Sequence, residues 1–406
     1  MLALDSSKVE RAATFLFAIS ITFFSLAPFS VRATFCAYLA LCLLALWRMQ
    51  QMLASAGNGV KAIALGVVVV CYAFLMSAFH DFYWNFFLKF VFIQIYIALI
   101  FWMFNSGVLN LRSMLRACEF LIYVHAGFFL LQLIYFIATG HFIDFDSYIR
   151  ESASESLYGT KALADSLIPI RAVGLYSEPS FYSMTVVPAG IVVLLIQRRI
   201  TLASGLAIAT SVLSMSIAAV LICAILGAVH IVVGKISTAL KIAIVATAIV
   251  LAVPLYKVYD LRVNQSVDYD AVASRSLIFE EIKHRDMSQI FFGNGFFWDE
   301  RNTVGKTHLR GFQVRDSSFY AYLLFTSGAI GALVFLVGLI SMFVGQERWK
   351  YLLYLAPLLF FKFHLIYGFL WLIILLFVVL AKKLPFVIPE GKGMRGVRNG
   401  QKTRAA

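Results

Sequence analysis

The chain has 406 residues, of which 61% are hydrophobic and 14% are charged, and its net charge is +13. A soluble protein carries about 25% charged residues, and a water-exposed fold cannot shield so much apolar surface. The composition therefore excludes an ordinary soluble protein and predicts an all-α integral membrane protein. Many of the cations lie in short segments between apolar runs, where Lys and Arg set membrane topology, so no nucleic-acid partner is expected.

The apolar runs predict the membrane-spanning helices. The first run, from Ala12 to about Val31, is too long for a signal-peptide core and is expected to be a retained helix. A bilayer core needs about 20 apolar residues per helix, and on that basis the chain forms about twelve spans. The expected spans are residues 12–31, 33–47, 62–79, 86–104, 117–139, 180–196, 200–215, 217–233, 242–256, 318–344, 351–361 and 363–380.

The short-loop cations predict the topology. If the N-terminus is in the cytoplasm, the positive-inside rule places them all on that side. They are Lys8, Arg11, Arg48, Lys61, Arg112, Arg116, Arg198, Arg199, Lys235, Lys241, Arg348 and Lys350. An even number of spans then separates each group from the next. Both termini are therefore expected in the cytoplasm, with the basic tail 382–406 near anionic membrane lipid.

Two segments, 141–177 and 257–317, are much longer than a turn. On the predicted topology both face the non-cytoplasmic side, and together they hold most of the acidic residues of the chain. Long loops are usually functional, although a solvated cap is the simpler alternative. The whole chain, 1–406, is expected to form one transmembrane domain.

The cysteines favour neither a metal site nor a disulfide framework. All of them lie within or at the edge of apolar runs, and none has the Cys-x-x-Cys spacing typical of metal ligands. They are Cys36, Cys42, Cys71, Cys118 and Cys223. We expect no metal and no other cofactor.

Residues 171–180, with the sequence Arg-Ala-Val-Gly-Leu-Tyr-Ser-Glu-Pro-Ser, mark the point where the first long loop meets a helix. Pro179 suits a first helical turn and Glu178 complements the helix dipole, so a plain helix cap explains both. Arg171 is harder to explain as structure. Near the membrane surface, its guanidinium can hold a phosphate through two hydrogen bonds.

The second long loop contains three further polar groups. The first is Ser274-Arg275-Ser276, in which Arg275 is either functional or an ordinary surface residue. Residues 292–296, Phe-Gly-Asn-Gly-Phe, indicate a turn and lack the Lys of a phosphate-binding P-loop. The last group precedes a helix, where an acid can be only a cap. It comprises His308, Arg310, Arg315, Asp316, Ser317, Ser318, Phe319 and Tyr320, and the pair Gly328 and Gly331 beyond it indicates close helix packing.

Ionisable residues also occur within and beside the apolar runs. Lys89 and Glu119 lie near span ends, from which long side chains can reach the membrane surface. His125 lies deeper and is a candidate functional residue. Lys362 and His364 lie at an outer turn, where they can help to line a cavity.

Three of these features, in this order, resemble the bacterial O-antigen and capsular polysaccharide polymerases and the related O-antigen ligases. They are Arg171 with Gly174 and Glu178-Pro179-Ser180; Ser274-Arg275; and residues 292–295 followed by Asp316-Ser317-Ser318-Phe319-Tyr320, Gly328 and Gly331. The resemblance covers mainly residues 171–335. The ligases typically carry a His-Asn-type motif where this chain has Asp316-Ser317, and this departure favours the polymerases.

The resemblance implies a GT-C-like membrane fold in the bacterial inner membrane and an undecaprenyl-pyrophosphate-linked oligosaccharide as substrate. Polymerisation would take place at the periplasmic face, with a chain-length regulator and a flippase as candidate partners. The remaining alternatives are an O-antigen ligase, a lipid-linked oligosaccharide flippase or transporter, and a non-catalytic assembly protein. A transporter places its charges at mid-membrane, whereas the charges here lie in outer loops.

Metal-independent glycosyl transfer requires three things of the protein. It must neutralise the pyrophosphate leaving group, orient the acceptor hydroxyl and remove its proton. Arginines suit the first task, and the candidates are Arg171, Arg275, Arg315 and Arg310. A carboxylate suits the last task, and the candidates are Asp316 and Glu178, with His308 and Tyr320 as further candidate site residues.

Overall fold

The computed structural model describes residues 6–150, 170–233, 241–242, 246, 256, 260, 278, 281–298, 314–345 and 347–384. Within these parts the protein is all-helical, with 77% helix and no β-strand. The prediction of an all-α chain is therefore confirmed for the described residues. The expected span 242–256 lies almost entirely outside them.

Six helices of the described chain are long and apolar enough to cross a membrane. They are α1 (Ser6–Leu26), α4 (Ala56–Leu75), α5 (Trp84–Asn105), α6 (Leu111–Thr139), α9 (Pro179–Gln197) and α15 (Phe319–Ser341). Shorter helices pack between them, namely α2 (Val31–Trp47), α10 (Leu202–Leu213), α11 (Ile217–Val233), α16 (Trp349–Leu358) and α17 (Gly368–Lys383). The smallest helices are α3 (Met49–Leu53), α7 (Asp146–Ile149), α14 (Met287–Phe292) and the 3₁₀ turn η2 (Val314–Asp316). The number of spans and the GT-C-like class stay predictions.

The helices begin and end where local backbone chemistry permits, which shifts several predicted boundaries. The helix α1 ends at Leu26, ahead of Pro28, and Ser30 then caps α2 by accepting a hydrogen bond from Ala33 N at 3.2 Å. Similarly, Asn110 caps α6 by accepting from Ser113 N at 2.8 Å. Hydropathy alone does not register such caps, so α6 begins six residues before the predicted start at 117.

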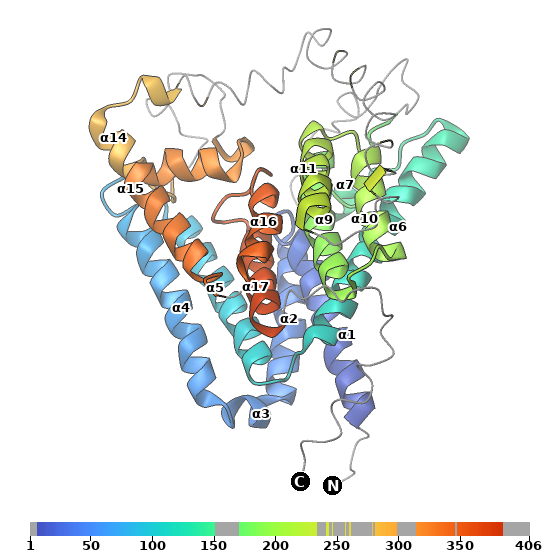
Figure 1. Ribbon diagram of the computed structural model, residues 1–406, viewed down its shortest axis with the longest axis horizontal. Coiled ribbons are helices and arrows are strands. Elements are labelled where there is room, and N and C mark those ends of the chain that lie inside the picture. Colours follow the sequence, from blue (N-terminus) through green and yellow to red (C-terminus); the bar gives the residue numbers. More distant parts are fainter. Residues whose placement is uncertain are drawn as a thin grey trace.

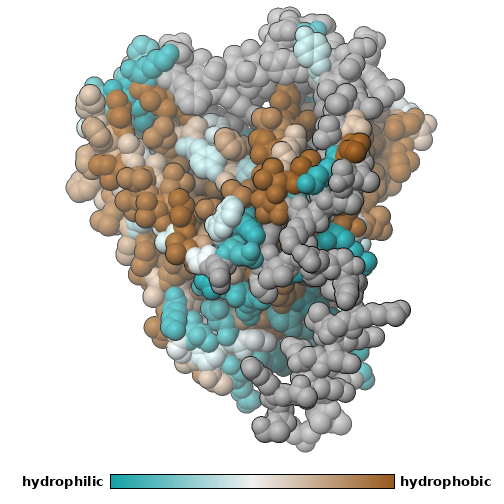
Figure 2. Space-filling model, viewed as in Figure 1, coloured by the Kyte–Doolittle hydropathy of each residue, from teal (hydrophilic) through white to brown (hydrophobic). Residues whose placement is uncertain are grey.

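The bundle has two distinct ends, and α3 lies at the lower one in Figure 1. At this end, called here the tail end, Lys383 Nζ at the end of α17 donates to Phe104 O at the end of α5, at 2.5 Å. The start of α6 joins the start of α1 there through Asn110 Nδ2 and Glu10 Oε1, at 3.0 Å. Figure 2 shows a hydrophilic zone toward this end and hydrophobic side chains over most of the face above it. That distribution fits a helix bundle embedded in a bilayer.

The opposite end, called here the site end, has the turns that precede α2, α5, α9, α15 and α17. The predicted loop 141–177 is only partly a surface loop, because residues 170–173 are buried. The predicted cytoplasmic tail also begins too early, since Lys382 and Lys383 belong to α17.

The helix α15 is kinked at Gly328, where φ is +64° and ψ is −173°. The kink packs against α14, as Figure 1 shows. A Cβ on Gly328 would lie 2.4 Å from the Phe291 carbonyl, and one on Gly293 would lie 2.3 Å from Thr326 O. Asn294 N and Gly295 N both donate to that Thr326 oxygen, at 3.1 and 2.8 Å. The two glycine motifs read from the sequence therefore form one packing joint.

Substituting alanine at Gly328 is expected to lower the free energy of unfolding by about 2–4 kcal/mol, because it adds backbone strain to a steric clash. Gly338 in the same helix is the matched control, since a Cβ there meets nothing within 4 Å. Gly338→Ala should change stability by no more than about 1 kcal/mol. Thermal unfolding of the two purified variants in detergent provides the measurement, and equal midpoints would contradict the proposed joint.

Candidate functional site

The segment that leads into α9 is held against α6 by hydrogen bonds from its backbone to a side chain of that helix. Gln132 Oε1 accepts hydrogen bonds from Val173 N at 2.7 Å and from Gly174 N at 3.1 Å. Gly174 has a φ of +59°, and a Cβ there would lie 3.2 Å from Phe129 N of α6. The glycine of this motif therefore allows both a left-handed turn and close approach to the helix.

A buried polar network fixes the same segment to α1. The Tyr176 hydroxyl donates to Ser25 Oγ at 3.1 Å and lies 3.2 Å from His125 Nε2, which is itself 3.0 Å from Ser25 Oγ. All three side chains are fully buried. His125, a candidate functional residue from the sequence, thus has a structural role as the anchor of Tyr176.

Glu178 is the central carboxylate of the site. Its Oε2 lies 2.5 Å from Lys362 Nζ and accepts a hydrogen bond from Ser180 Oγ at 3.1 Å. The Lys362 ammonium also lies 4.3 Å from the centre of the Phe181 ring. Glu178 stands at the N-cap position of α9 but makes no side-chain capping hydrogen bond. The sequence-based explanation of Glu178 as a plain helix cap therefore does not describe its side chain, whereas Pro179 does begin α9 as predicted.

The surroundings of Glu178 keep it ionised. Burial by itself raises the pKa of the carboxyl, but the charge and hydrogen bond of Lys362 outweigh that effect. The Ser180 hydroxyl and the charge of Arg171 act in the same direction. The pKa of Glu178 thus lies below its usual value, and the carboxylate is charged at neutral pH.

The half-buried imidazole of His364 lies among several cations in the turn before α17. Burial lowers its pKa well below the usual value. Three nearby cations lower it further, namely Arg315, Lys89 and Lys362. His364 is therefore neutral at physiological pH, so it can both donate and accept hydrogen bonds.

Arg171, Lys362, Arg315 and Lys89 together are called here the cationic cluster. Arg171 is buried and acts on Glu178, while Arg315 donates to Trp298 O at 3.1 Å and lies 4.6 Å from the centre of the Phe86 ring. Lys362 links Arg171 to the other two cations of the cluster, since its charge acts on both Glu178 and His364. Two of these cations, Lys362 and Arg171, act on Glu178, and three, Arg315, Lys89 and Lys362, act on His364. This part of the site end is therefore electropositive, which favours a multiply charged anion.

The structure locates only some of the site residues predicted from the sequence. It brings Arg171 and Glu178 together beside Lys362, and Arg315 lies near His364, which Lys362 also influences. Asp316 ends η2 directly after Arg315, but its side chain lies outside the described residues, as do Arg275, His308 and Arg310. The cap of α15 is Ser318, which accepts from Ala321 N at 3.3 Å, so Asp316 does not occupy the N-cap position.

Tyr320 has a packing role instead of a place in the cluster. Its hydroxyl donates to Ala356 O of α16 at 2.8 Å. Two important residues, Lys362 and Lys89, were absent from the predicted site. The sequence did contain a signal for both, because each Lys lies next to or within an apolar run. Placing a charge there costs free energy, so such a residue usually has a function.

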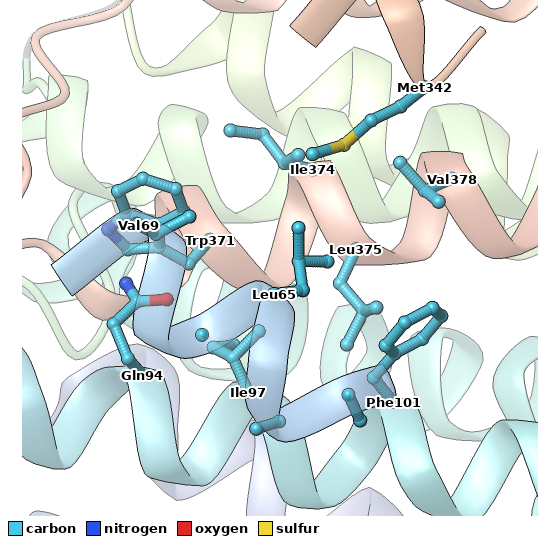
Figure 3. Close-up of a pocket in the computed structure, with 13 residues that line it drawn as sticks. Leu65, Val69, Gln94, Ile97, Phe101, Met342, Trp371, Ile374, Leu375 and Val378 are labelled. Atoms are coloured by element: carbon cyan, nitrogen blue, oxygen red, sulfur yellow. The ribbon is translucent and has the colours of Figure 1, made fainter. Parts of the chain in front are cut away.

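A cavity of about 60 Å³ lies between α4, α5 and α17, as shown in Figure 3. Its walls are apolar apart from Gln94, whose Nε2 is buried and has no hydrogen-bond partner among the described residues. A bound water needs two to four polar partners, and an anion needs positive charge. This cavity offers neither, so it is not a candidate site.

A second cavity, of about 200 Å³, lies beside the predicted Asp316-Ser317-Ser318 motif. It is lined by Ser317 and Ser318 and by Leu221 and Ile222 of α11. The hydroxyls are already used, because Ser317 Oγ donates to Val314 O at 2.6 Å and Ser318 caps α15. The cavity thus adjoins the site without adding charged groups to it.

Comparison with family models, curated proteins and solved structures gives no match for this chain.

Proposed function

We propose that the protein is a polysaccharide polymerase that joins undecaprenyl-pyrophosphate-linked repeat units at the outer face of a bacterial inner membrane. The observation that carries the proposal is the ionised Glu178 within the cationic cluster, at one end of a bundle of apolar helices. A lipid-linked substrate keeps its pyrophosphate at the membrane surface, which is where such a cluster can meet it.

In the proposed reaction, a hydroxyl oxygen of the acceptor glycan attacks the anomeric carbon of the donor sugar. The bond from that carbon to the pyrophosphate oxygen breaks, and the pyrophosphate leaves with the bonding electrons. Arg171 and Arg315 stabilise its charge, with Arg275 and Arg310 as further candidates. A carboxylate, Glu178 or Asp316, accepts the hydroxyl proton.

Substrate binding itself would prepare Glu178 for this role. In the empty site, Lys362 lowers the pKa of Glu178 and so weakens it as a base. A pyrophosphate that binds Lys362 competes for that cation and adds negative charge nearby, and both effects raise the pKa of Glu178. The carboxylate would therefore become more basic when the donor is in place.

The proposal requires both long loops to be periplasmic and both termini to be cytoplasmic. The supporting pattern is that Arg48, Arg112, Arg198 and Arg348 all lie at helix ends opposite Glu178. Reporter fusions after Ala153 and after Thr303 should accordingly give periplasmic signals. A cytoplasmic signal from either fusion would contradict the site.

The decisive experiment is reconstitution with a single substrate. Purified protein supplied only with undecaprenyl-pyrophosphate-linked repeat units is expected to produce a ladder of longer lipid-linked glycans, with no divalent metal added. The physical reason is that pyrophosphate is already a good leaving group and the cationic cluster supplies the charge neutralisation. Gel electrophoresis of the extracted lipid-linked glycans would reveal the ladder.

Two other outcomes would replace the proposal. Transfer only to lipid A core, with no lipid-linked ladder, would indicate a ligase. Movement of intact substrate across a liposome bilayer without any new glycosidic bond would indicate a transporter.

A further inference from the structure

A groove of about 690 Å³ lies in the side of the bundle, beside the site. It runs between the turn joining α1 to α2, the first turns of α5 and the start of α17. Its walls are largely apolar and aromatic, with Phe29, Phe35, Tyr38 and Phe92 among them, and Lys89 is the one charged residue among the described residues that line it. It is called here the side groove.

The side groove opens toward the surface that would face lipid. Val31, Phe35 and Phe92, which line it, are 71%, 65% and 56% exposed. Large apolar side chains with such exposure are stable in hydrocarbon but costly in water. A hydrocarbon chain can therefore enter this groove from the bilayer without crossing water.

Lys89 provides a polar anchor within this apolar groove. It lies about one and a half turns into α5. The residue as a whole is exposed, and its side chain makes no hydrogen bond or ion pair with another described residue. A cation at this depth without a protein partner is costly, and an anionic ligand would offset that cost.

The groove adjoins the cationic cluster, and Lys89 belongs to both. Phe29 lines the groove, and its ring centre lies 4.9 Å from that of Phe181, against which the Lys362 ammonium packs. Lys89, Arg315 and Lys362 all act on His364, so these cations are near neighbours. An elongated ligand can thus place its apolar part in the groove while its charged end reaches the cluster.

We infer that the side groove binds the chain of a polyprenyl lipid, and that Lys89 binds the phosphate where the chain meets the head. The identity of the lipid rests on the proposed function. The charge of the head supports the same choice, because three neighbouring cations match a phosphate monoester or pyrophosphate. A monoester carries about −1.5 to −2 at neutral pH, more than the single charge of a phosphodiester such as phosphatidylglycerol.

Binding of undecaprenyl phosphate to the full-length protein in detergent, measured by native mass spectrometry, tests this inference. Lys89→Met is expected to weaken binding about tenfold or more, because a charge-assisted hydrogen bond is lost. Lys61→Met is the matched control, since Lys61 lies exposed in α4 away from the groove and should leave affinity unchanged. Val31→Trp, which fills the groove mouth and spares every cation, should weaken binding as well.

Competition identifies which part of the lipid is recognised. Phosphatidylglycerol and inorganic pyrophosphate should both compete much less well than undecaprenyl phosphate. Equal competition by phosphatidylglycerol would overturn the choice of a polyprenyl lipid, and equal competition by pyrophosphate would show that the groove holds no chain. Unchanged affinity in both Lys89→Met and Val31→Trp would also overturn the inference.

These outcomes are separable from failure of the proposed function. Undecaprenyl phosphate that binds in a Lys89-dependent way, without any glycan ladder from repeat units, would remove the polymerase proposal and keep the groove. A normal glycan ladder, together with undecaprenyl phosphate binding that does not depend on Lys89, would keep the polymerase proposal and remove the groove.

Discussion

Replacing Glu178 by glutamine is expected to lower glycan polymerisation by about 10²–10⁴-fold, the usual contribution of a general base. Glutamine keeps the shape of the side chain but cannot accept a proton. The change should appear mainly in kcat, because Glu178 itself repels the pyrophosphate, so its loss does not weaken donor binding. Initial rates at saturating lipid-linked repeat units measure the effect.

Glu119→Gln is the matched control for this substitution. Glu119 forms an ion pair with Arg116 at 3.0 Å within α6, and its loss should leave turnover unchanged. A Glu178→Gln enzyme as active as the Glu119→Gln enzyme would remove Glu178 from catalysis. Asp316→Asn, tested in parallel, then decides the remaining candidate: a large loss would identify Asp316 as the base.

Replacing Arg171 by lysine is expected to reduce kcat by about 10²-fold, although the charge is retained. A guanidinium holds an anion through two parallel hydrogen bonds, whereas an ammonium is a point charge on a flexible stem. Loss of one well-placed donor to a developing anion typically has this magnitude. The assay is the same rate measurement, with KM for the lipid-linked donor determined separately.

Arg116→Lys is the matched control, because the Arg116 side chain is 64% exposed at the tail end, away from Glu178. It should retain full activity. An Arg171→Lys enzyme with unchanged kcat would mean that Arg171 supplies only charge. If its thermal midpoint also fell sharply, Arg171 would be a structural residue of the buried loop instead of a pyrophosphate ligand.

Hydropathy predicted the all-helical class and the six long apolar helices, because each of these is an uninterrupted apolar run of about bilayer length. The boundaries were less accurate, since caps such as Asn110 and breaks such as Pro28 act through backbone hydrogen bonds that hydropathy does not register. The kink of α15 was also missed. The sequence shows Gly328, but only the approach of Phe291 explains why the helix bends there.

The candidate site was predictable in part. Arg171 and Glu178 were found because they share one short motif with Pro179. Lys362 was noted but left out of the site because its partner lies 184 positions away, and a sequence alone does not reveal such a pairing. Tyr320 was a further candidate because it belongs to the motif that begins at Asp316, whereas its hydroxyl donates to the backbone carbonyl of Ala356.

The distance in sequence between Glu178 and Lys362 also bears on biogenesis. At about 5–20 residues per second, a ribosome needs roughly 10–40 s to make the 184 residues that separate them. During that interval α9 has emerged while its carboxylate still lacks its cation. The pair closes only when the turn before α17 arrives, so this bond couples insertion of the first half of the chain to completion of the last helices.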